Sequence, residues 1–273
     1  MSQPTQSKVA IVTGGADGIG RATASRLGER GHAIAIWDVR SSAAEDAANL
    51  LRASGIRALA VECDVTSEID VERATERVAS ELGPPSVLVN SAGVAAPFER
   101  LEDSSLPDWQ RVMDVYATGV FLCTKHVGGL MLKQRSGSIV TVASVAGVIP
   151  QVRMAAYSAA KAAVIRFTQV VALEWGPRGI RANTVSPGQI RTRLTEPTYA
   201  SVPELLRERS RIVPLRRIGT PSDVAEVIAF LASDDAAYVT GVDIVVDGGL
   251  ALTVTTALPR LVDGKIVRMQ DLD

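Results

Sequence analysis

The sequence predicts an α/β fold, a doubly wound parallel sheet of about seven strands with helices on both faces. Short apolar runs rich in β-branched residues alternate along the chain with longer segments of helical spacing. The short runs are apolar throughout, which is typical of strands buried on both faces. With 273 residues, 47% of them hydrophobic and 22% charged, the chain has enough apolar material to bury such a sheet.

The elements follow one another in a regular order. The first strand is expected over residues 9–12, and the helix over residues 19–30 ends at Gly31. The helix over residues 43–53 is closed in the same way by Gly55. Further strands are expected over residues 33–37, 58–62, 87–89, 138–142, 180–185 and 244–246, and further helices over residues 68–82, 106–135 and 155–175.

Two segments fall outside this pattern. Residues 189–214 contain several Arg, Thr and Pro residues without clear periodicity, and a long irregular segment in an α/β domain is usually functional. A substrate lid is therefore expected there. Residues 251–273 follow the last expected strand and form a carboxyl-terminal extension of mixed character. Because no linker or repeat divides the chain, residues 1–273 are expected to form a single domain.

Composition and charge exclude several classes of protein. The net charge of −1 gives no indication of a nucleic-acid or membrane-surface partner. Residues 1–7 are polar and do not resemble a signal peptide, and no run of 18 apolar residues occurs. Cys63 and Cys123 are expected to be buried free thiols. A cytoplasmic protein is expected.

The pair Tyr157 and Lys161 is the first candidate for chemistry. Residues four apart lie on the same face of a helix, so the phenol and the ammonium are expected to be neighbours. A nearby positive charge favours the phenolate and is expected to lower the pKa of Tyr157 from its usual value. Such a tyrosine can serve as a general acid and base near neutral pH.

A glycine-rich turn follows the first strand directly, in the order Gly14, Asp17, Gly18, Ile19 and Gly20, and a helix begins at its end. Glycines there permit a tight turn and a close approach of the backbone to a pyrophosphate, while the helix amino terminus offers free N–H groups. The turn therefore predicts a dinucleotide site in a single-domain Rossmann fold.

Asp38 ends the second strand, 18 residues after Gly20. A carboxylate at this point can accept hydrogen bonds from the ribose hydroxyls of NAD and would repel the additional phosphate of NADP. Asp17 adds negative charge in the same region, whereas Arg40 favours NADP. NAD is the expected cofactor.

Taken together, these parts resemble the short-chain dehydrogenase/reductase family, from about Lys8 to Gly249. The motifs that carry the resemblance occur in one order: Thr13 to Gly20, Asp64-Val65, Asn90-Ser91-Ala92-Gly93, Ser144, Tyr157 to Lys161, Pro187-Gly188, and Asp247-Gly248-Gly249.

The resemblance implies hydride transfer between a nicotinamide and a carbonyl or alcohol carbon. Tyr157 would donate or accept the proton, Lys161 would lower the pKa of Tyr157 and hold the nicotinamide ribose, and Ser144 would bind the substrate oxygen. Hydroxyl donors aimed at a developing alkoxide make chemical sense for this reaction. No metal is expected. The resemblance implies further cofactor contacts by Asp64, Val65, Asn90, Ala92, Gly93, Pro187, Gly188, Ile190 and Thr192.

One position departs from the family pattern. Tyr116 stands where the family usually has an Asn, which normally holds a water that links Lys161 to solvent. An altered proton relay, a reshaped pocket and a loss of activity are the open outcomes. The hypothesis favoured by the intact Ser144, Tyr157 and Lys161 is a slower or rerouted proton exchange.

A secondary alcohol or ketone is the expected substrate, because the resemblance implies a moderately apolar pocket framed by Val145, Ala146, Gln151, Val152 and Leu194, with Ala95 to Arg100 beside it. The resemblance also implies a homodimer or homotetramer through the helices over residues 106–135 and 155–175. Two alternatives remain: an NADPH-linked 3-oxoacyl-thioester reductase, and a dinucleotide-binding subunit without activity.

Overall fold

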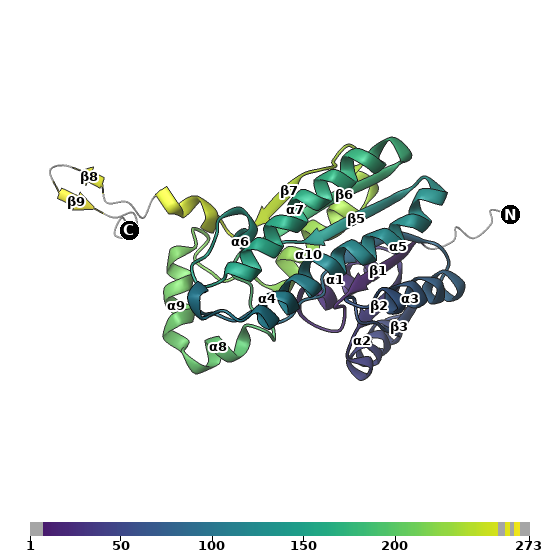
Figure 1. Cartoon of the computed structure of the whole chain (residues 1–273), viewed down its shortest axis with the longest axis horizontal. Helices are drawn as coiled ribbons and strands as arrows, with labels where there is room; N and C mark the ends of the chain where they lie inside the picture. Colours follow the sequence, from purple (N-terminus) through teal and green to yellow (C-terminus); the bar gives the residue numbers. More distant parts are fainter. Residues whose placement is uncertain (1–7, 256–259, 263–264, 268–273) are drawn as a thin grey trace.

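A seven-stranded parallel sheet forms the centre of the protein in a computed structural model that describes residues 8–255, 260–262 and 265–267 (Figure 1). The strand order is β3-β2-β1-β4-β5-β6-β7, so the order reverses between β1 and β4. This is the doubly wound α/β fold that the sequence predicts. The strands are β1 (Val9–Thr13), β2 (Ala33–Asp38), β3 (Ala58–Glu62), β4 (Pro85–Asn90), β5 (Gly137–Val142), β6 (Ile180–Pro187) and β7 (Asp243–Val246).

Helices cover both faces of the sheet, and each face has its own apolar cluster because successive strand residues point to opposite sides. On β1, for example, Ile11 belongs to one cluster and Val12 to the other. The Ile11 side is covered by α3 (Glu68–Glu81), α5 (Gly119–Gln134) and α7 (Ala155–Trp175), and the Val12 side by α1 (Gly18–Glu29), α2 (Ser41–Ala53) and α10 (Pro221–Ala232).

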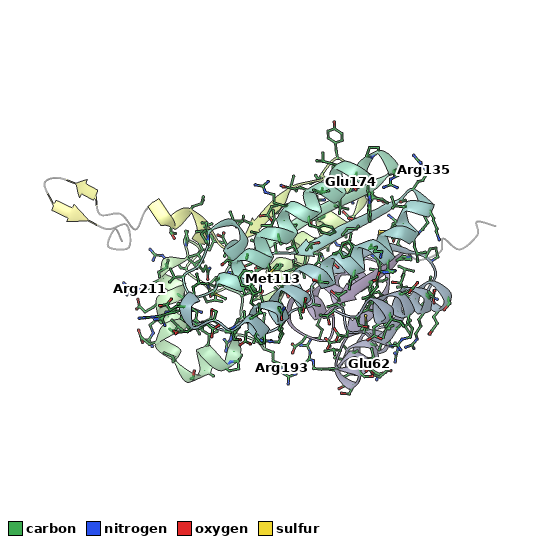
Figure 2. All side chains as sticks on the ribbon, viewed as in Figure 1. Glu62, Met113, Arg135, Glu174, Arg193 and Arg211 are labelled. Atoms are coloured by element: carbon green, nitrogen blue, oxygen red, sulfur yellow. The ribbon has the colours of Figure 1, made fainter. Side chains whose placement is uncertain are left out.

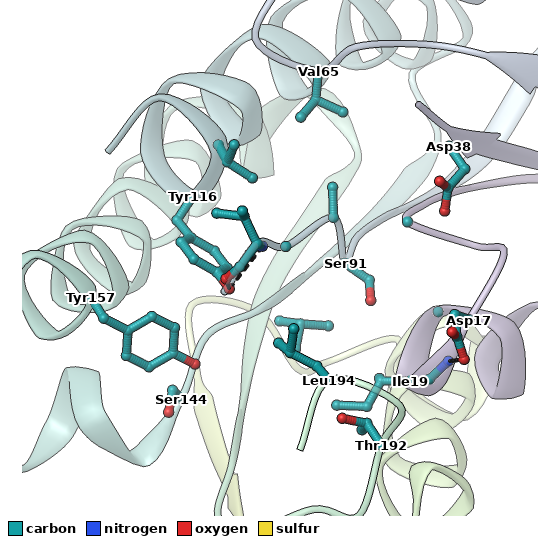
Figure 3. Close-up of a pocket in the computed structure, with 18 of the residues that line it drawn as sticks. Asp17, Ile19, Asp38, Val65, Ser91, Tyr116, Ser144, Tyr157, Thr192 and Leu194 are labelled. Atoms are coloured by element: carbon teal, nitrogen blue, oxygen red, sulfur yellow. Dashed lines mark hydrogen bonds between the residues drawn. The ribbon is translucent and has the colours of Figure 1, made fainter. Parts of the chain in front are cut away.

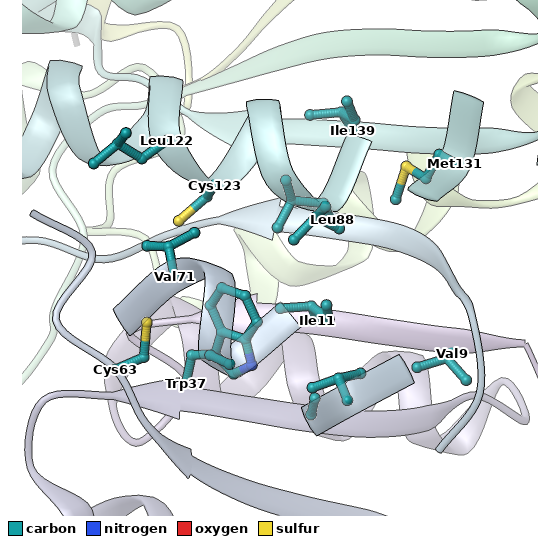
Figure 4. Packing of buried hydrophobic residues seen from close by; sticks show 14 of the residues in the cluster. Val9, Ile11, Trp37, Cys63, Val71, Leu88, Leu122, Cys123, Met131 and Ile139 are labelled. Carbon is teal, nitrogen blue, oxygen red and sulfur yellow. The ribbon is translucent and has the colours of Figure 1, made fainter. Parts of the chain in front are cut away.

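Both cysteines lie in the first of these clusters, where Trp37 is the largest buried side chain (Figure 4). Cys63 and Cys123 are free and buried, as the sequence predicts. Burial is the main cause that raises the pKa of the Cys63 thiol, to about 12, and it also raises the pKa of Cys123. Charged side chains such as Arg135, Glu174 and Arg211 lie at the periphery instead (Figure 2).

The long helix predicted over residues 106–135 is present but changes type in its middle. It begins as α4 (Leu106–Met113), where the Ser105 side chain accepts a hydrogen bond from the N–H of Asp108. The segment Asp114–Thr118 is a π-helix, and α5 continues from it. Single π-turns inside α-helices are often found at functional sites.

The described part of the chain contains four α-helices that are absent from the predicted set. The helix α10 is absent from the predicted elements, and the segment predicted to be irregular contains α8 (Glu196–Ser201) and α9 (Pro203–Ile212). A further short helix, α6 (Val145–Val148), lies between β5 and α7. The irregular interpretation of residues 189–214 is therefore wrong over α8 and α9, whose short lengths give little periodicity to recognise.

Several predictions fall at the ends of the chain. Residues 1–7 lie outside the described residues, as do residues 256–259, 263–264 and 268–273 of the predicted extension. The described parts of that extension include a 3₁₀ segment, Leu250–Thr255, and an antiparallel pair formed by β8 (Arg260–Val262) and β9 (Lys265–Val267).

Among the described residues, one helix is long and apolar enough to cross a membrane, by length and composition alone. It is the continuous helix Leu106–Gln134, which contains charged residues and no run of 18 apolar ones. In the described fold, however, its central and last turns pack on the sheet: Leu122, Cys123, Val127 and Met131 belong to the apolar core. A helix apolar over much of its surface is typical of a buried core helix.

Candidate active site

A cavity of about 1060 Å³ opens at the carboxyl ends of the strands, next to the point where the strand order reverses. Such a crevice is the usual ligand site of a doubly wound sheet. Every predicted motif except Asp247-Gly248-Gly249 contributes residues to the cavity lining, although Asn90 itself does not line the cavity. Figure 3 shows Tyr157 and Ser144 at one end and Asp17 and Asp38 at the other.

The glycine-rich turn forms one wall. Gly14 has a φ of +61°, and a Cβ atom at this position would lie 2.8 Å from the Cα of Ala92. Gly18 also has a positive φ, and a Cβ atom at Gly20 would collide with the carbonyl oxygen of Gly14. Any side chain at Gly14 or Gly20 would therefore fill or distort the turn where it meets the amino terminus of α1.

Both carboxylates at this end of the cavity have arginine partners. Asp17 caps α1 through a 2.7 Å hydrogen bond from the N–H of Gly18 and lies 3.6 Å from Arg193. Asp38 is 7% exposed and accepts hydrogen bonds from the backbone N–H and the guanidinium of Arg40, at 3.0 and 3.2 Å. The charge of Asp17 is thus directed into the helix cap and towards Arg193.

The segment after β4 is held by Thr13, whose hydroxyl accepts hydrogen bonds of 3.0 Å from the N–H groups of Ser91 and Ala92. Ser91, Ala92 and Gly93 line the cavity, whereas Asn90 does not. Asn90 is buried, and its amide lies 3.3 Å from the hydroxyls of Thr124 and Thr141. The position of Asn90 ties α5 to the sheet behind the cavity.

Two further predicted segments also reach the cavity. Asp64 and Val65 line it after β3, where the carboxylate of Asp64 accepts hydrogen bonds from the N–H and the hydroxyl of Thr66. Pro187, Gly188, Ile190 and Thr192 line it after β6, and the Thr192 N–H donates to the hydroxyl of Thr195.

Ser144 and Tyr157 meet at the other end of the cavity, where both side chains line its wall. Ser144 follows β5 and caps α6, because its hydroxyl accepts a 3.1 Å hydrogen bond from the N–H of Ala146. Burial raises the pKa of Tyr157, and the nearby Ser144 hydroxyl opposes this shift. The two hydroxyls therefore lie near each other in the cavity wall.

Lys161 lies one turn further along α7 and is 5% exposed. Its Nζ donates a 2.6 Å hydrogen bond to the carbonyl oxygen of Val142 and lies 5.7 Å from the centre of the Tyr157 ring. Burial lowers the pKa of Lys161 to about 7. The predicted net lowering of the pKa of Tyr157 is not found, because burial dominates for this phenol and also weakens the charge of the lysine.

Tyr116 lies in the π-helix beside these residues. Its hydroxyl donates a 2.6 Å hydrogen bond to the carbonyl oxygen of Val94 and accepts one of 3.1 Å from the N–H of Val94 (Figure 3). Its ring meets that of Tyr157 edge to face, with 5.2 Å between centroids and an interplanar angle of 83°. A Cβ atom at Gly93 would approach the Tyr116 hydroxyl to 3.0 Å, so Gly93 leaves room for the phenol.

The remaining wall includes residues that sequence reasoning missed. Of the predicted framing residues Leu194 lines the cavity, whereas Val145, Ala146, Gln151 and Val152 do not. One group of missed residues belongs to one face of α4 and the π-helix, at the helical spacing that could have revealed it. This group consists of Pro107, Gln110, Arg111, Asp114 and Val115.

The donor set fits a dinucleotide. One end of the cavity offers a glycine cradle at a helix amino terminus, suited to a pyrophosphate, and a nearly buried carboxylate, suited to ribose hydroxyls. The other end offers two hydroxyls and an amine to a reacting oxygen. No group of three or more His, Cys, Asp or Glu residues that could hold a metal ion occurs in the part of the chain that the structure describes.

Comparisons with known proteins agree with this geometry. A family model described as enoyl-(acyl carrier protein) reductase matches residues 14–251. The cis-4-hydroxycyclohexanecarboxylate dehydrogenase of Sinomonas cyclohexanicum is 43% identical, over 91% of this chain and 98% of the relative. The 3-oxoacyl-[acyl-carrier-protein] reductase of a Synechocystis strain is also 43% identical, over 90% of this chain and 98% of the relative.

Among solved structures, an NAD⁺-bound xylitol dehydrogenase superposes with a TM-score of 0.86 at 35% identity, over 90% of this chain and all of the other. The relatives are dehydrogenases and reductases that match along nearly their whole length. The chain therefore belongs to the short-chain dehydrogenase/reductase family and is an oxidoreductase of the kind that uses a nicotinamide dinucleotide.

Proposed function

We propose that the protein is an NAD-dependent dehydrogenase that interconverts a secondary alcohol and a ketone, with Ser144, Tyr157 and Lys161 as its catalytic residues. The observation that carries this proposal is their position. The Ser144 and Tyr157 side chains line the same cavity as the glycine-rich turn, with Ser144 near enough to lower the pKa of Tyr157, and Lys161 lies one helical turn away.

Each residue has a defined task in the proposed reaction. When bound, the nicotinamide supplies the acceptor or donor of the hydride. In the reducing direction Tyr157 donates its phenolic proton to the carbonyl oxygen, and in the oxidising direction it accepts the alcohol proton. Ser144 donates a hydrogen bond to the same oxygen as negative charge develops there.

Lys161 supports both directions through its charge. A protonated amine 5.7 Å from the Tyr157 ring makes the phenolate less unfavourable than burial alone would make it. Because burial brings the pKa of Lys161 to about 7, this support is present in acid and is lost as the pH rises through neutrality in the free enzyme. Lys161 also reaches the cavity and would hold the nicotinamide ribose.

The preference for NAD over NADP rests on Asp38. Its carboxylate lines the cavity at the end of β2, where it can accept hydrogen bonds from the ribose hydroxyls and would repel a 2′-phosphate. The other proposed contacts are Gly14, Asp17, Gly18, Ile19, Gly20, Asp64, Val65, Ala92, Gly93, Pro187, Gly188, Ile190 and Thr192, all of which line the cavity. Asn90 is proposed to act indirectly, by supporting this wall.

The proposed substrate is a small secondary alcohol with an apolar body. The apolar side chain of Leu194 lines the cavity. A similar dehydrogenase is named for a hydroxylated cyclohexane ring, which agrees with such a pocket. We propose that the enzyme works in the direction of alcohol oxidation and that it is located in the cytoplasm.

A second candidate function is reduction of a 3-oxoacyl thioester with NADPH. The relative of that activity is as similar as the cyclohexane dehydrogenase, and Arg40 at the cavity mouth could bind a 2′-phosphate after leaving Asp38. The partial neutralisation of Asp38 by Arg40 is the feature that favours this alternative.

Assembly as a homodimer or homotetramer is part of the proposal. Phe121 on α5 and Val170 and Leu173 on α7 are exposed apolar side chains, with Leu173 79% exposed. Burial of such groups between subunits would be favourable. Size-exclusion chromatography with light scattering tests this point, and a clean monomer would contradict it.

The decisive experiment combines binding with turnover. NAD at a hundredfold excess over its dissociation constant is expected to stabilise the protein by about 2.7 kcal/mol. Oxidation of cyclohexanol-type alcohols with NAD, but not with NADP, is expected in the parent. Tyr157→Phe, which keeps the ring and removes the proton, is expected to lower kcat by at least about 100-fold while NAD still binds. Unchanged kcat in this variant would rule out the proposed role of Tyr157.

A further inference from the structure

Tyr116 is buried, and its hydroxyl is held by two hydrogen bonds. It is 6% exposed, and its hydroxyl both donates to the carbonyl oxygen of Val94 and accepts from the N–H of the same residue. Burial also raises the pKa of this phenol. A hydroxyl with both functions engaged and no tendency to ionise is not suited to carry protons, so its role has to be sought in the ring.

The ring of Tyr116 presents its face to Lys161. The Lys161 Nζ lies 4.2 Å from the centre of this ring, closer than its distance of 5.7 Å from the centre of the Tyr157 ring. The two rings meet edge to face, so Lys161, Tyr116 and Tyr157 form one packed cluster. An ammonium over an aromatic face within about 6 Å is attracted by the negative face of the ring.

Lys161 has few other partners for its charge. The Lys161 amine donates to the carbonyl oxygen of Val142 on β5, and the titratable neighbour of Lys161 on α7 is Tyr157. The short helix α6 packs on the Lys161 backbone at Gly147 and contains no titratable residue. No carboxylate in the described part of the chain contributes to the pKa of Lys161, for which burial is the single cause.

We propose that Tyr116 is a positioning residue that acts through Lys161: its ring face stabilises the Lys161 ammonium in a dry site and holds it between Val142 and Tyr157. The functional meaning of this contact rests on the proposed role of Lys161 in catalysis. In place of a polar residue that would hold water, the chain has an aromatic face that replaces water as the partner of the cation. Tyr116 thereby keeps Lys161 charged to a higher pH than burial alone would allow.

The sharpest test measures the pKa of Lys161 directly in the protein without cofactor. The chain has only five lysines, Lys8, Lys125, Lys133, Lys161 and Lys265, so an NMR titration of ¹³Cε-labelled lysine gives few signals, and K161M assigns the one of interest. Y116F keeps the ring face and removes the hydroxyl. Y116L and Y116M keep an apolar side chain and remove the ring face.

The expected results separate the ring from the hydroxyl. The titration midpoint of Lys161 is expected to lie above 7 in the parent, because burial alone gives a pKa of about 7, and to change by only a few tenths of a unit in Y116F. In Y116L and Y116M it is expected to fall by about one pH unit, towards the value set by burial, as the loss of a buried cation–π contact implies. An unchanged or raised midpoint in the leucine and methionine variants would overturn the proposal, as would a fall in Y116F equal to theirs.

Turnover provides a second, separate readout. The pH at which kcat/KM loses the contribution of Lys161 is expected to shift downwards in Y116L and Y116M and to remain in place in Y116F. A shift of the lysine signal in protein that oxidises no alcohol would refute the proposed function and leave the contact intact. Normal turnover with an unshifted signal would refute the contact and leave the proposed function intact.

Discussion

Asp38 is the residue on which the choice of cofactor depends. Its nearly buried carboxylate is held by Arg40, so removal of the carboxylate changes two things at once. The ribose hydroxyls of NAD lose a charged acceptor, and the Arg40 guanidinium becomes available to a 2′-phosphate. In Asp38→Ser, kcat/KM with NAD is expected to fall by about 10- to 100-fold, as a loss of about 1.5–3 kcal/mol implies. Activity with NADP is expected to rise.

The ratio of kcat/KM for the two cofactors is the measurement that checks this expectation. Asp103→Ser is the matched control, because Asp103 is an exposed aspartate outside the cavity lining and the chemical change is the same. An unchanged ratio in Asp38→Ser would show that Asp38 does not determine the preference between NAD and NADP. A large change of the ratio in the control would point to a general effect of charge.

Contacts between individual residues could be predicted from the sequence where a motif sets a spacing. The proximity of Ser144 and Tyr157 is of this kind. The cap formed by Asp17 and the position of Asn90 behind the cavity depend on hydrogen bonds that no motif encodes. The burial of Lys161 could not be predicted either. Helical spacing shows which residues are neighbours, but it does not show how much water reaches them.

At the scale of elements, α10 has a reciprocal capping box in its first turn. Thr220 accepts a hydrogen bond from the N–H of Asp223, the Asp223 carboxylate accepts one from the N–H of Thr220, and Arg217 pairs with that carboxylate. This pairing lowers the pKa of Asp223. Thr220→Ala is expected to reduce the free energy of unfolding by about 1 kcal/mol, measured by urea denaturation.

Ser222→Ala, two residues further on in the same turn and exposed, is the control and is expected to change stability by less than about 0.5 kcal/mol. Equal effects of the two substitutions would contradict the assignment of the cap to Thr220. The sequence Thr220-Pro221-Ser222-Asp223 is a recognisable helix start, so α10 could have been predicted. The π-helix at Asp114–Thr118 could not, because its wider turn accompanies the packing of Tyr116 against Lys161 and Val94.

At the scale of the whole molecule, the doubly wound sheet explains why distant motifs meet. Parallel strands end at one edge, so the segments after β1 to β6 all border one cavity. One apolar cluster packs against each face of the sheet. Successive residues of β1 belong to alternate clusters, as Ile11 and Val12 do. The fold could be predicted because apolar strands alternate with helices along the whole sheet, whereas each site contact depends on a single side chain.

The stability of the whole molecule is expected to depend on pH through Lys161. Its pKa is about 7 in the folded protein and about 10.4 in an unfolded chain, so between these values the unfolded chain holds a proton that the folded protein does not. The free energy of unfolding therefore rises with pH in this window, by up to about 1.4 kcal/mol per unit. The thiols of Cys63 and Cys123 have raised pKa values and reverse this trend near pH 9, so the range from pH 7 to 8.5 is the useful one.

Lys161→Met removes the titrating group and keeps most of its volume. The parent protein is expected to gain about 1.5 kcal/mol relative to this variant between pH 7 and 8.5, because all other titrating groups are common to both and cancel in the difference. Urea denaturation at the two pH values measures it. A difference that stays constant would mean that Lys161 keeps its charge throughout this range in the folded protein, and hence that its site is better solvated, or its cation better compensated, than its burial against Tyr116 and Val142 implies.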